Sequence, residues 1–344
     1  MSKHQNKILI IYSGGTIGMQ KDNDTGALIP FDFSKIREYI PELKLIDKEI
    51  NATSFDDPID SSNVQIKHWK MLAQMIEDQY DNYDGFVILH GSDTMAYTAS
   101  MLSFLLENLS KPVVLTGSQL PIGDLRTDAK ENIITSIEIA GSYKDGKPLV
   151  PEVSIYFEFK LLRGNRTTKA NAEHFNAFDS PNYQPLMQSG VNLKFFERRI
   201  LPQSTGIFNA YKEIDSNVVV YKMHPGIYEK QLLYIINIPD LKAIILETYG
   251  TGNAITAPWF LKAIRIAIEQ KGIYIANITQ CHSGKIFPDK YDTGRKLMET
   301  GVLNGGDLTT EAALTKMMYL LTKKMTKKGL KQAFERSLRG EMSS

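Results

Sequence analysis

Short apolar runs along the chain each end in a polar turn that contains glycine. Three runs lie in the N-terminal half, at 8–12, 86–89 and 113–115, and two in the C-terminal half, at 243–246 and 273–275. The runs are rich in β-branched residues and do not alternate with polar ones. This pattern is typical of strands that are buried on both faces of a sheet.

Between these runs, apolar residues recur at helical spacing. The predicted helices cover 68–79, 95–107, 132–142, 257–270 and 311–322. Strands that alternate with helices predict an α/β protein with a mostly parallel sheet. Ligands of such sheets bind beyond the carboxyl ends of the strands, where the glycine turns fall. We therefore expect a site made from several turns.

The alternation stops near the middle of the chain. Residues 182–203 lack it, Pro202–Gly206 is a cluster of turn-forming residues, and a new rhythm starts near 218–220. We therefore expect two α/β domains joined by a linker. The expected ranges are 1–190 for the N-terminal domain, 191–216 for the linker and 217–344 for the C-terminal domain.

Charge and cysteine content exclude several classes of protein. The chain has 40 Lys and Arg against 39 Asp and Glu, a formal net charge of +1, so a nucleic-acid partner is not expected. The single cysteine, Cys281, excludes an intrachain disulfide. The apolar run 8–12 is too short for a signal peptide, and no stretch approaches the ~18 apolar residues of a membrane span. We expect a soluble cytoplasmic protein without membrane contacts.

Basic residues gather near the C-terminus and alternate with apolar residues at helical spacing. Because the whole chain has no basic excess, we interpret them as the solvated face of helices over a core stripe rather than as a membrane-surface helix. The basic residues are Lys316, Lys323, Lys324, Lys327, Lys328, Lys331, Arg336 and Arg339.

The common nucleotide and metal signatures do not match. Gly14–Gly18 lacks the spacing of the dinucleotide fingerprint, and neither Gly146-Lys147 nor Gly284-Lys285 belongs to a phosphate-binding loop. The six histidines are scattered, which predicts no metal site. A Gly-x-Ser-x-Gly elbow is absent from the sequence. His90 precedes Gly91-Ser92, but adjacent strand residues point apart, so we interpret it as a polar strand-end residue.

Hydroxyl and carboxylate groups on the turns remain as candidates for chemistry. Thr16 follows two glycines; by itself this pattern favours a helix N-cap, and a Thr nucleophile needs a base. Ser92-Asp93-Thr94 precedes a predicted helix, whose N-terminus stabilises anions. Asp60-Ser61-Ser62 adds further small polar groups. In the loop 163–169, burial of Lys169 would lower its pKa and make it usable as a base.

Six segments of the chain form a recognisable series: Tyr12–Met19, Asp84–Thr98, Thr116–Gln119, Leu162–Lys169, Tyr249–Ala254 and Thr279–Cys281. Taken together and in this order, they resemble the bacterial-type L-asparaginase family, and in particular its cytoplasmic type I branch. The resemblance covers nearly the whole chain. It implies a larger N-terminal catalytic domain, with a mostly parallel sheet flanked by helices, and a smaller flavodoxin- or Rossmann-like C-terminal α/β domain.

The resemblance also implies an activity: hydrolysis of the side-chain amide of L-asparagine to L-aspartate and ammonia, without a metal or organic cofactor. It makes Thr16 the nucleophile of an acyl-enzyme, which splits a difficult amide hydrolysis into two steps. Ser92, Asp93 and Lys169 are the supporting catalytic residues. The residues implied to bind the substrate's α-carboxylate and α-ammonium are Asp60, Ser61, Ser62, Gly91, Ser92 and Asp93. A homodimer or homotetramer is implied, with Asn253 reaching a neighbouring subunit's site.

Three features differ from the family pattern. Ser92 stands where the family usually has Thr, and we expect activity to be retained because the hydroxyl remains. The segment 20–30 resembles the family's mobile lid but has no Tyr, with Ala27 and Leu28 in its place. Glu247 replaces an Arg of a regulatory asparagine site, so we expect weak or absent allostery. The residues matching that regulatory site are Thr168, Glu247, Thr279, Gln280 and Cys281.

Three other functions remain open at this stage. A broad asparaginase–glutaminase would also accept glutamine, which is longer than asparagine by one methylene. A pocket discriminates against one methylene by only about 1–3 kcal/mol, so the sequence leaves this preference open. The amidase subunit of a tRNA-dependent amidotransferase usually has an extra N-terminal domain, for which the first motif, starting at Lys7, leaves no room. A non-catalytic amino-acid sensor on the same fold is suggested by Ser92 and by the missing lid Tyr.

Overall fold

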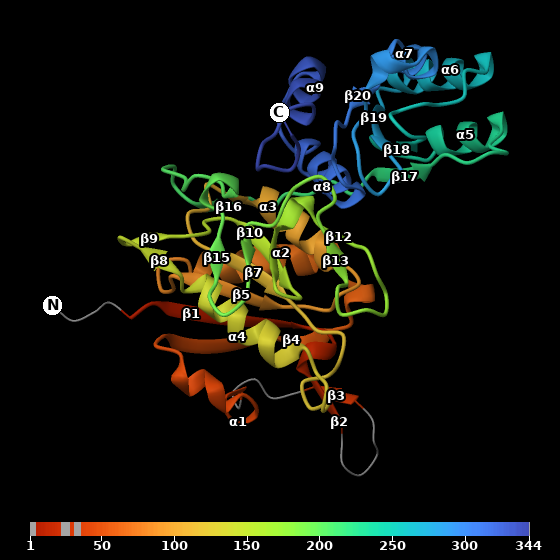
Figure 1. Ribbon diagram of the computed structural model, residues 1–344. Coiled ribbons are helices and arrows are strands. Elements are labelled where there is room, and N and C mark those ends of the chain that lie inside the picture. The colour runs from red at the N-terminus through yellow and green to blue at the C-terminus, as the bar shows by residue number, and fades with distance from the viewer. Residues whose placement is uncertain (1–4, 22–27, 31–35, 344) are drawn as a thin grey trace. The chain divides into compact units, whose positions relative to one another are not determined.

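The computed structural model describes residues 5–21, 28–30 and 36–343 (Figure 1). The chain divides into two units, Met1–Lys212 and Glu213–Ser344. This division lies inside the segment 191–216 that the sequence predicts as a linker.

An eight-stranded sheet forms the centre of the first unit. Its order is β15-β14-β11-β10-β7-β5-β1-β4. The strands from β10 to β4 are parallel, whereas β11, β14 and β15 are antiparallel. The strand bounds are β1 Lys7–Gly14, β4 Glu49–Ile59, β5 Gly85–Leu89, β7 Val113–Thr116, β10 Val153–Phe157, β11 Lys160–Arg163, β14 Met187–Gln188 and β15 Lys194–Phe195.

Helices cover both faces of this sheet, with α4 on one face and α2 and α3 on the other (Figure 1). The helix bounds are α1 Ile36–Tyr39, α2 Ile66–Asp78, α3 Met95–Leu105 and α4 Ala129–Ala140. Ile8, Ile10 and Tyr12 of β1 share a core cluster with Ile133 and Ile137 of α4. Alternate residues of one strand thus face the same helix, as the pleat of a strand requires.

Short elements complete the first unit. Four pairs of small strands are β2 Met19–Lys21 with β3 Leu28–Pro30, β6 Leu106–Glu107 with β16 Asn209–Ala210, β8 Tyr143–Lys144 with β9 Lys147–Pro148, and β12 Thr168–Lys169 with β13 Phe178–Asp179. Single 3-10 turns are η1 Thr16–Gly18, η3 Pro41–Leu45, η4 Ser61–Asn63, η5 Gly164–Arg166 and η6 Glu197–Arg199.

The end of the predicted linker packs on the first unit. Phe208 stacks on Tyr80 with ring centroids 3.6 Å apart. The Ala210 N–H donates to Glu77 Oε1 over 3.1 Å, and Lys212 forms an ion pair with the same carboxylate. These contacts explain why the first unit extends to Lys212.

The second unit contains a four-stranded parallel sheet of order β17-β18-β19-β20. Its strands are β17 Val218–Lys222, β18 Ala243–Thr248, β19 Tyr274–Thr279 and β20 Leu303–Asn304. Its helices are α5 Glu229–Ile236, α6 Pro258–Arg265 continued by a π-helix at Ile266–Gln270, η8 Pro288–Lys290, α7 Asp292–Met298, α8 Thr310–Leu320 and α9 Lys327–Phe334. Together the two units confirm the predicted two-domain α/β fold with mostly parallel sheets.

Most of the basic C-terminal residues are exposed as expected, and Lys323 and Arg339 are partly exposed. For Lys316 the prediction is wrong. Its side chain is fully buried and its Nζ lies 2.6 Å from Glu341 Oε1. It also donates to the carbonyls of Phe334 and Arg336, over 2.7 and 2.6 Å. A helical basic run cannot predict this, because the carboxylate comes from a segment 25 residues further on. No helix within the described residues is long and apolar enough to cross a bilayer.

Candidate active site

Four neighbouring parallel strands, β4, β1, β5 and β7, end at one edge of the first sheet. The carboxyl ends of parallel strands are where ligands bind in α/β sheets. The turns that follow these strands carry nearly all the residues predicted for the site. They are Gly15–Gly18, Asp60–Ser62, His90–Asp93 and Gly117–Gln119.

Three of these turns approach each other so closely that only glycine fits. A Cβ on Gly15, which has φ +90°, would lie 2.4 Å from Gly91 Cα. A Cβ on Gly91 would in turn lie 2.5 Å from Ser61 Oγ. Such distances are far inside van der Waals contact, so the backbone of Gly15 packs on that of Gly91, and the backbone of Gly91 packs on the side chain of Ser61. The turn that carries Thr16, which is half-buried, therefore abuts the turn that carries Ser92, and the latter abuts Ser61.

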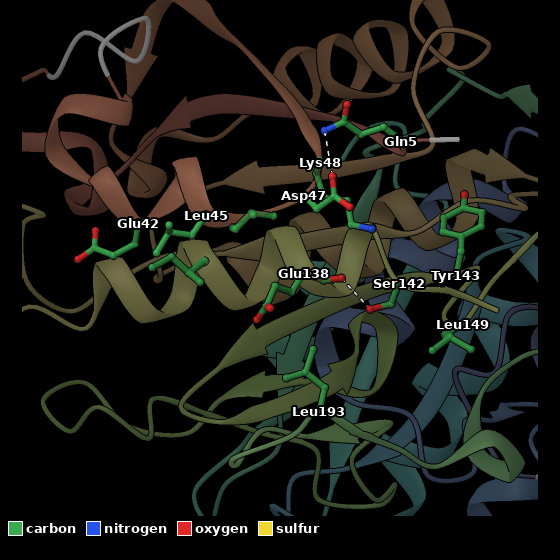
Figure 2. Close-up of a pocket in the computed structure, with 13 residues that line it drawn as sticks. Gln5, Glu42, Leu45, Asp47, Lys48, Glu138, Ser142, Tyr143, Leu149 and Leu193 are labelled. Atoms are coloured by element: carbon green, nitrogen blue, oxygen red, sulfur yellow. Dashed lines mark hydrogen bonds between the residues drawn. The ribbon is translucent and has the colours of Figure 1, made fainter. Parts of the chain in front are cut away.

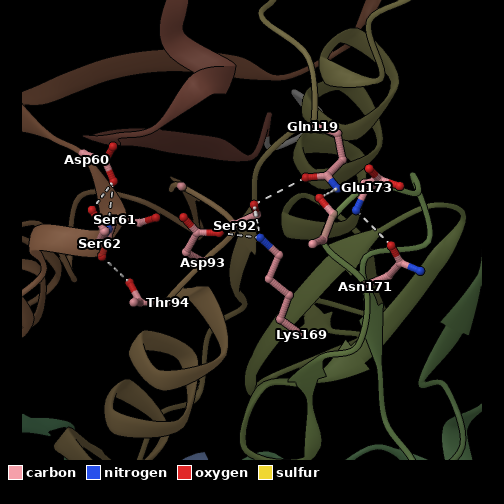
Figure 3. Close-up of polar contacts among 12 residues, drawn as sticks. Asp60, Ser61, Ser62, Ser92, Asp93, Thr94, Gln119, Lys169, Asn171 and Glu173 are labelled. Atoms are coloured by element: carbon pink, nitrogen blue, oxygen red, sulfur yellow. Dashed lines mark hydrogen bonds and ion pairs between the residues drawn. The ribbon is translucent and has the colours of Figure 1, made fainter.

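Lys169 joins this edge from β12, far along the chain (Figure 3). Its Nζ donates to Ser92 Oγ over 2.9 Å and to Asp93 Oδ1 over 2.5 Å. The Lys169 side chain is 19% exposed and the Asp93 side chain 62% exposed. A largely enclosed ammonium thus bonds a hydroxyl and a carboxylate that still faces solvent. This arrangement suits proton transfer at the hydroxyl and capture of a cationic group by the carboxylate.

The Asp60 turn is organised by its own hydrogen bonds. Asp60 Oδ1 accepts from the backbone N–H and from the hydroxyl of Ser62, each over 2.8 Å. These bonds hold the pKa of Asp60 below its ordinary value, so the carboxylate stays charged. Ser61 is buried, and its carbonyl accepts from Thr94 Oγ1 over 2.8 Å. The turn is thereby tied to the start of α3.

Gln119 also belongs to the site, although it is not among the residues predicted from the sequence. Ser92 Oγ donates to its Oε1 over 3.4 Å, and its Nε2 donates to the carbonyls of Ala172 and His174, over 3.3 and 3.0 Å. Its amide therefore connects Ser92 to the loop that follows Lys169 (Figure 3). The available signal was its place at the end of β7, next to β5 in the sheet.

His90 is a structural residue, in line with its interpretation as a polar strand-end residue. It is 2% exposed, and burial lowers its pKa to about 4. The carbonyl of Gly91 can only accept, so His90 Nδ1 donates to it over 2.7 Å and carries the proton of the neutral ring. The opposite nitrogen, Nε2, then accepts from Thr98 Oγ1 over 2.9 Å, and Thr98 Oγ1 accepts from Trp69 Nε1 over 2.9 Å. A neutral imidazole thus orients the peptide that precedes Ser92.

The predicted regulatory residues fall into both units. Thr168 lies in β12 of the first unit, and the other four lie at the carboxyl ends of β18 and β19. Glu247 is 9% exposed and accepts from Thr310 Oγ1 over 2.5 Å. Thr279 Oγ1 donates to the carbonyl of Gly250 over 2.6 Å and accepts from the N–H of Cys281 over 3.1 Å. Gln280 continues the β19 end, where its N–H donates to the carbonyl of Thr248.

Asn253, the predicted cross-subunit residue, is engaged within its own unit. Its Oδ1 accepts from Thr293 Oγ1 over 2.8 Å. Of the lid segment 20–30, residues 22–27 lie outside the described residues. The flanking strands Met19–Lys21 and Leu28–Pro30 pair in antiparallel fashion.

A separate cavity of about 740 Å³ lies in the first unit between η3 and α4 (Figure 2). Its lining includes Leu45, Lys48, Glu138 and Leu193 but none of the predicted site residues. Within the described ranges, no group of three or more His, Cys, Asp or Glu side chains is placed to hold a metal ion.

Fold and site together define a two-domain α/β protein with a lysine, a hydroxyl and a carboxylate clustered at the carboxyl edge of its larger sheet. Residues 7–201 match the family described as "Asparaginase, N-terminal", and residues 217–334 match "Glutaminase/Asparaginase C-terminal domain". The chain therefore belongs to the asparaginase family, as its motifs predict.

Individual relatives agree with this membership. The chain is 38% identical to L-asparaginase 1 of Escherichia coli K12, over 98% of both chains. It is also 38% identical to the 60 kDa lysophospholipase of Mus musculus, over 98% of this chain and 63% of that protein. The crystal structure of L-asparaginase I from Vibrio cholerae matches with a TM-score of 0.89 and 37% identity, covering 99% of this chain and 100% of that one.

Proposed function

We propose that the protein is an L-asparaginase, which hydrolyses the side-chain amide of L-asparagine to L-aspartate and ammonia. The observation that carries the proposal is the hydrogen-bonded cluster of Lys169, Ser92 and Asp93, on a turn packed against the one that bears Thr16. Membership of the asparaginase family, with full-length relatives named L-asparaginase, supports the same reaction.

The proposed reaction has two steps. Thr16 Oγ1 attacks the side-chain carbonyl carbon of asparagine, and its proton passes to the amide nitrogen. Ammonia then departs and leaves aspartate bound to Thr16 as an ester. Water then attacks the ester: its hydroxyl joins the acyl carbon of the released aspartate, and its other proton passes to Thr16 Oγ1. Lys169 and the Ser92 hydroxyl, 2.9 Å apart, supply the proton path. Backbone N–H groups of the glycine turns are the proposed donors to the oxyanion.

The substrate is a zwitterion, and the turns offer matching groups. The exposed carboxylate of Asp93 suits the α-ammonium of the substrate. The ion pair with Lys169 holds this carboxylate in place. Asp60, Ser61, Ser62 and Gly91 form the small polar turns that would hold the remainder of the amino-acid group. Fixing both charged groups of a short substrate orients its amide toward Thr16. This orientation raises the rate of the chemical step by more than binding without orientation would.

Some finer points stay predictions. They are the homodimeric or homotetrameric assembly with Asn253 reaching a neighbour, the cytoplasmic location, the regulatory site and the domain ranges 1–190 and 217–344. No metal or organic cofactor enters the proposed reaction.

Ammonia release from L-asparagine and from L-glutamine, with binding followed by calorimetry, tests the proposal. The wild type should release ammonia from asparagine, and Thr16→Ala should abolish release while still binding L-aspartate. Comparable rates on glutamine would mean a broad asparaginase–glutaminase. A wild type that binds asparagine without releasing ammonia would be an amino-acid sensor, and the proposal would fail.

A further inference from the structure

Thr16 stands at the start of a single 3-10 turn, Thr16–Gly18. The turn is closed by two backbone bonds, from Gly18 N–H to the Gly15 carbonyl over 3.1 Å and from Met19 N–H to the Thr16 carbonyl. One helical turn is not stable by itself, because few hydrogen bonds offset the ordering of its residues. Contacts from elsewhere in the fold must therefore hold the turn in place.

The phenol of Tyr12 supplies such a contact from the core side. Tyr12 is the last inward-facing residue of β1 in the core cluster and is 1% exposed. Its hydroxyl lies 3.1 Å from the Gly18 carbonyl oxygen and 3.3 Å from the Gly15 carbonyl oxygen, and its one proton is shared between them in a bifurcated hydrogen bond. Burial raises the pKa of Tyr12 to about 12, so the hydroxyl keeps its proton and remains a donor at neutral pH.

Gly18 fits this ring by having no side chain. A Cβ at Gly18 would lie 2.3 Å from both Cε2 and Cζ of Tyr12, closer than non-bonded carbon atoms approach each other. The ring thus fills the space beneath the turn, while its hydroxyl bonds the carbonyls at both ends. Packing and hydrogen bonding are two separate observations, and both tie Tyr12 to the turn.

We propose that Tyr12 is a positioning residue, which fixes the hydroxyl of Thr16 for attack by holding Gly15 and Gly18 from below. The inference rests on the proposed role of Thr16 as nucleophile. Tyr12 is buried beneath the turn and acts only through the backbone. A displacement of about 1 Å at a reacting atom can cost about 10²-fold in rate, so loss of the phenol acts on the chemical step. Substrate binding by the Asp60 and Asp93 turns is left in place.

The test compares Tyr12→Phe with the matched control Tyr156→Phe. Tyr156 is also fully buried in the first unit, but its hydroxyl donates to Glu131 Oε1, away from the site. We expect Tyr12→Phe to lower kcat on L-asparagine by about 10- to 100-fold, with KM and the Kd for L-aspartate within about twofold of the wild type. The control should keep kcat within about twofold of the wild type even if its thermal stability falls.

Hydrogen exchange gives a readout that does not depend on turnover. The amides of Gly18 and Met19 should exchange about tenfold faster in Tyr12→Phe and at the wild-type rate in Tyr156→Phe. Unchanged exchange with unchanged kcat would overturn the inference, and so would faster exchange without a loss of kcat. A wild type without turnover would instead overturn the proposed function, while exchange would still report whether the phenol holds the turn.

Discussion

Gly15 and Gly91 lie in backbone contact, so that a Cβ on Gly15 would meet Gly91 Cα at 2.4 Å. The two residues are 76 positions apart in the chain, and each immediately precedes a proposed catalytic residue, Thr16 or Ser92. Their contact sets how close those two hydroxyl groups can come. The glycines of the site are therefore spacers whose loss should alter activity before it alters the fold.

Gly91→Ala tests this spacing. The new methyl would lie 2.5 Å from Ser61 Oγ and 2.7 Å from Ser61 Cβ, so the Asp60–Ser62 turn must move. Such overpacking typically costs about 1–3 kcal/mol. We expect KM for L-asparagine to rise about tenfold or more. Gly123→Ala is the control, because a Cβ there meets nothing within 4 Å. Equal KM values for the two variants would contradict the prediction.

Lys169→Met should lower kcat on L-asparagine by about 10²–10⁴-fold, because it removes the proposed proton path while keeping much of the side-chain volume. Lys212→Met is a suitable control, since Lys212 forms an ion pair with Glu77 outside the site. Steady-state ammonia release measures both variants. A Lys169 variant with more than about a tenth of the wild-type kcat would remove Lys169 from the mechanism.

Ser92→Thr and Ser92→Ala separate the hydroxyl of Ser92 from its size. The Thr variant keeps the acceptor for Lys169 Nζ and adds a methyl that restricts χ1, so its kcat should stay within about fivefold of the wild type. The Ala variant should lose about 10²-fold or more. An inactive wild type that gains activity on Ser92→Thr would show that Ser92 is itself a defect.

Because of Glu247, we expect the rate of L-asparagine hydrolysis to depend hyperbolically on the L-asparagine concentration. Its buried carboxylate is bonded to Thr310, and it would repel the α-carboxylate of an effector bound beside it. Initial rates over a wide range of asparagine concentrations should give a Hill coefficient near one. The opposite finding would be a sigmoidal curve that Glu247→Gln makes hyperbolic.

His90 should make stability depend on pH in mild acid. Its pKa is about 4 in the folded state against 6.5 for an ordinary histidine, so between these values the unfolded chain binds a proton that the folded chain does not. Stability contributed by the neutral ring is therefore present above pH 6.5 and falls as the pH is lowered toward 4. At pH 5 the loss is about 2 kcal/mol.

Urea unfolding at pH 7 and pH 5 measures this dependence. His90→Gln is less stable at both pH values, because it breaks the chain of bonds from Trp69 to Gly91, but its loss between pH 7 and pH 5 should be smaller than that of the wild type. The same pH dependence in both proteins would show that His90 is not the group that titrates.

The sequence predicted the parts of the fold that depend on local pattern. The strands at 7–14, 85–89 and 113–116 were found because buried parallel strands are continuous apolar runs. Strand β4, Glu49–Ile59, was not found, because most of its residues are polar or exposed at the sheet edge. The antiparallel strands β14 and β15 have two residues each, too few to show a period.

Most of the turns that form the site could be predicted from the sequence, but the hydrogen bonds between their side chains could not. The strand-end rule brought the turns of Thr16 and Ser92 to one edge, and the structure places them there. The Asp60 turn follows β4, which the sequence did not predict, so only the family resemblance assigned this turn to the site. The bond from Lys169 to Ser92 joins residues 77 apart and depends on how the β12–β13 loop folds back. The hydrogen bond between Gln119 and Ser92 depends on the side-chain conformation of Gln119, which cannot be predicted from a sequence pattern.

The buried pair of Lys316 and Glu341 has a consequence for how the chain is made. Lys316 is enclosed in the second unit with no exposed surface, and its counter-charge comes only with residue 341. Until that residue leaves the ribosome, α8 can pack only by burying a lysine without its carboxylate, which is strongly unfavourable. The second unit should therefore complete its core only after synthesis has passed Glu341, and deletions that remove this residue should prevent its folding.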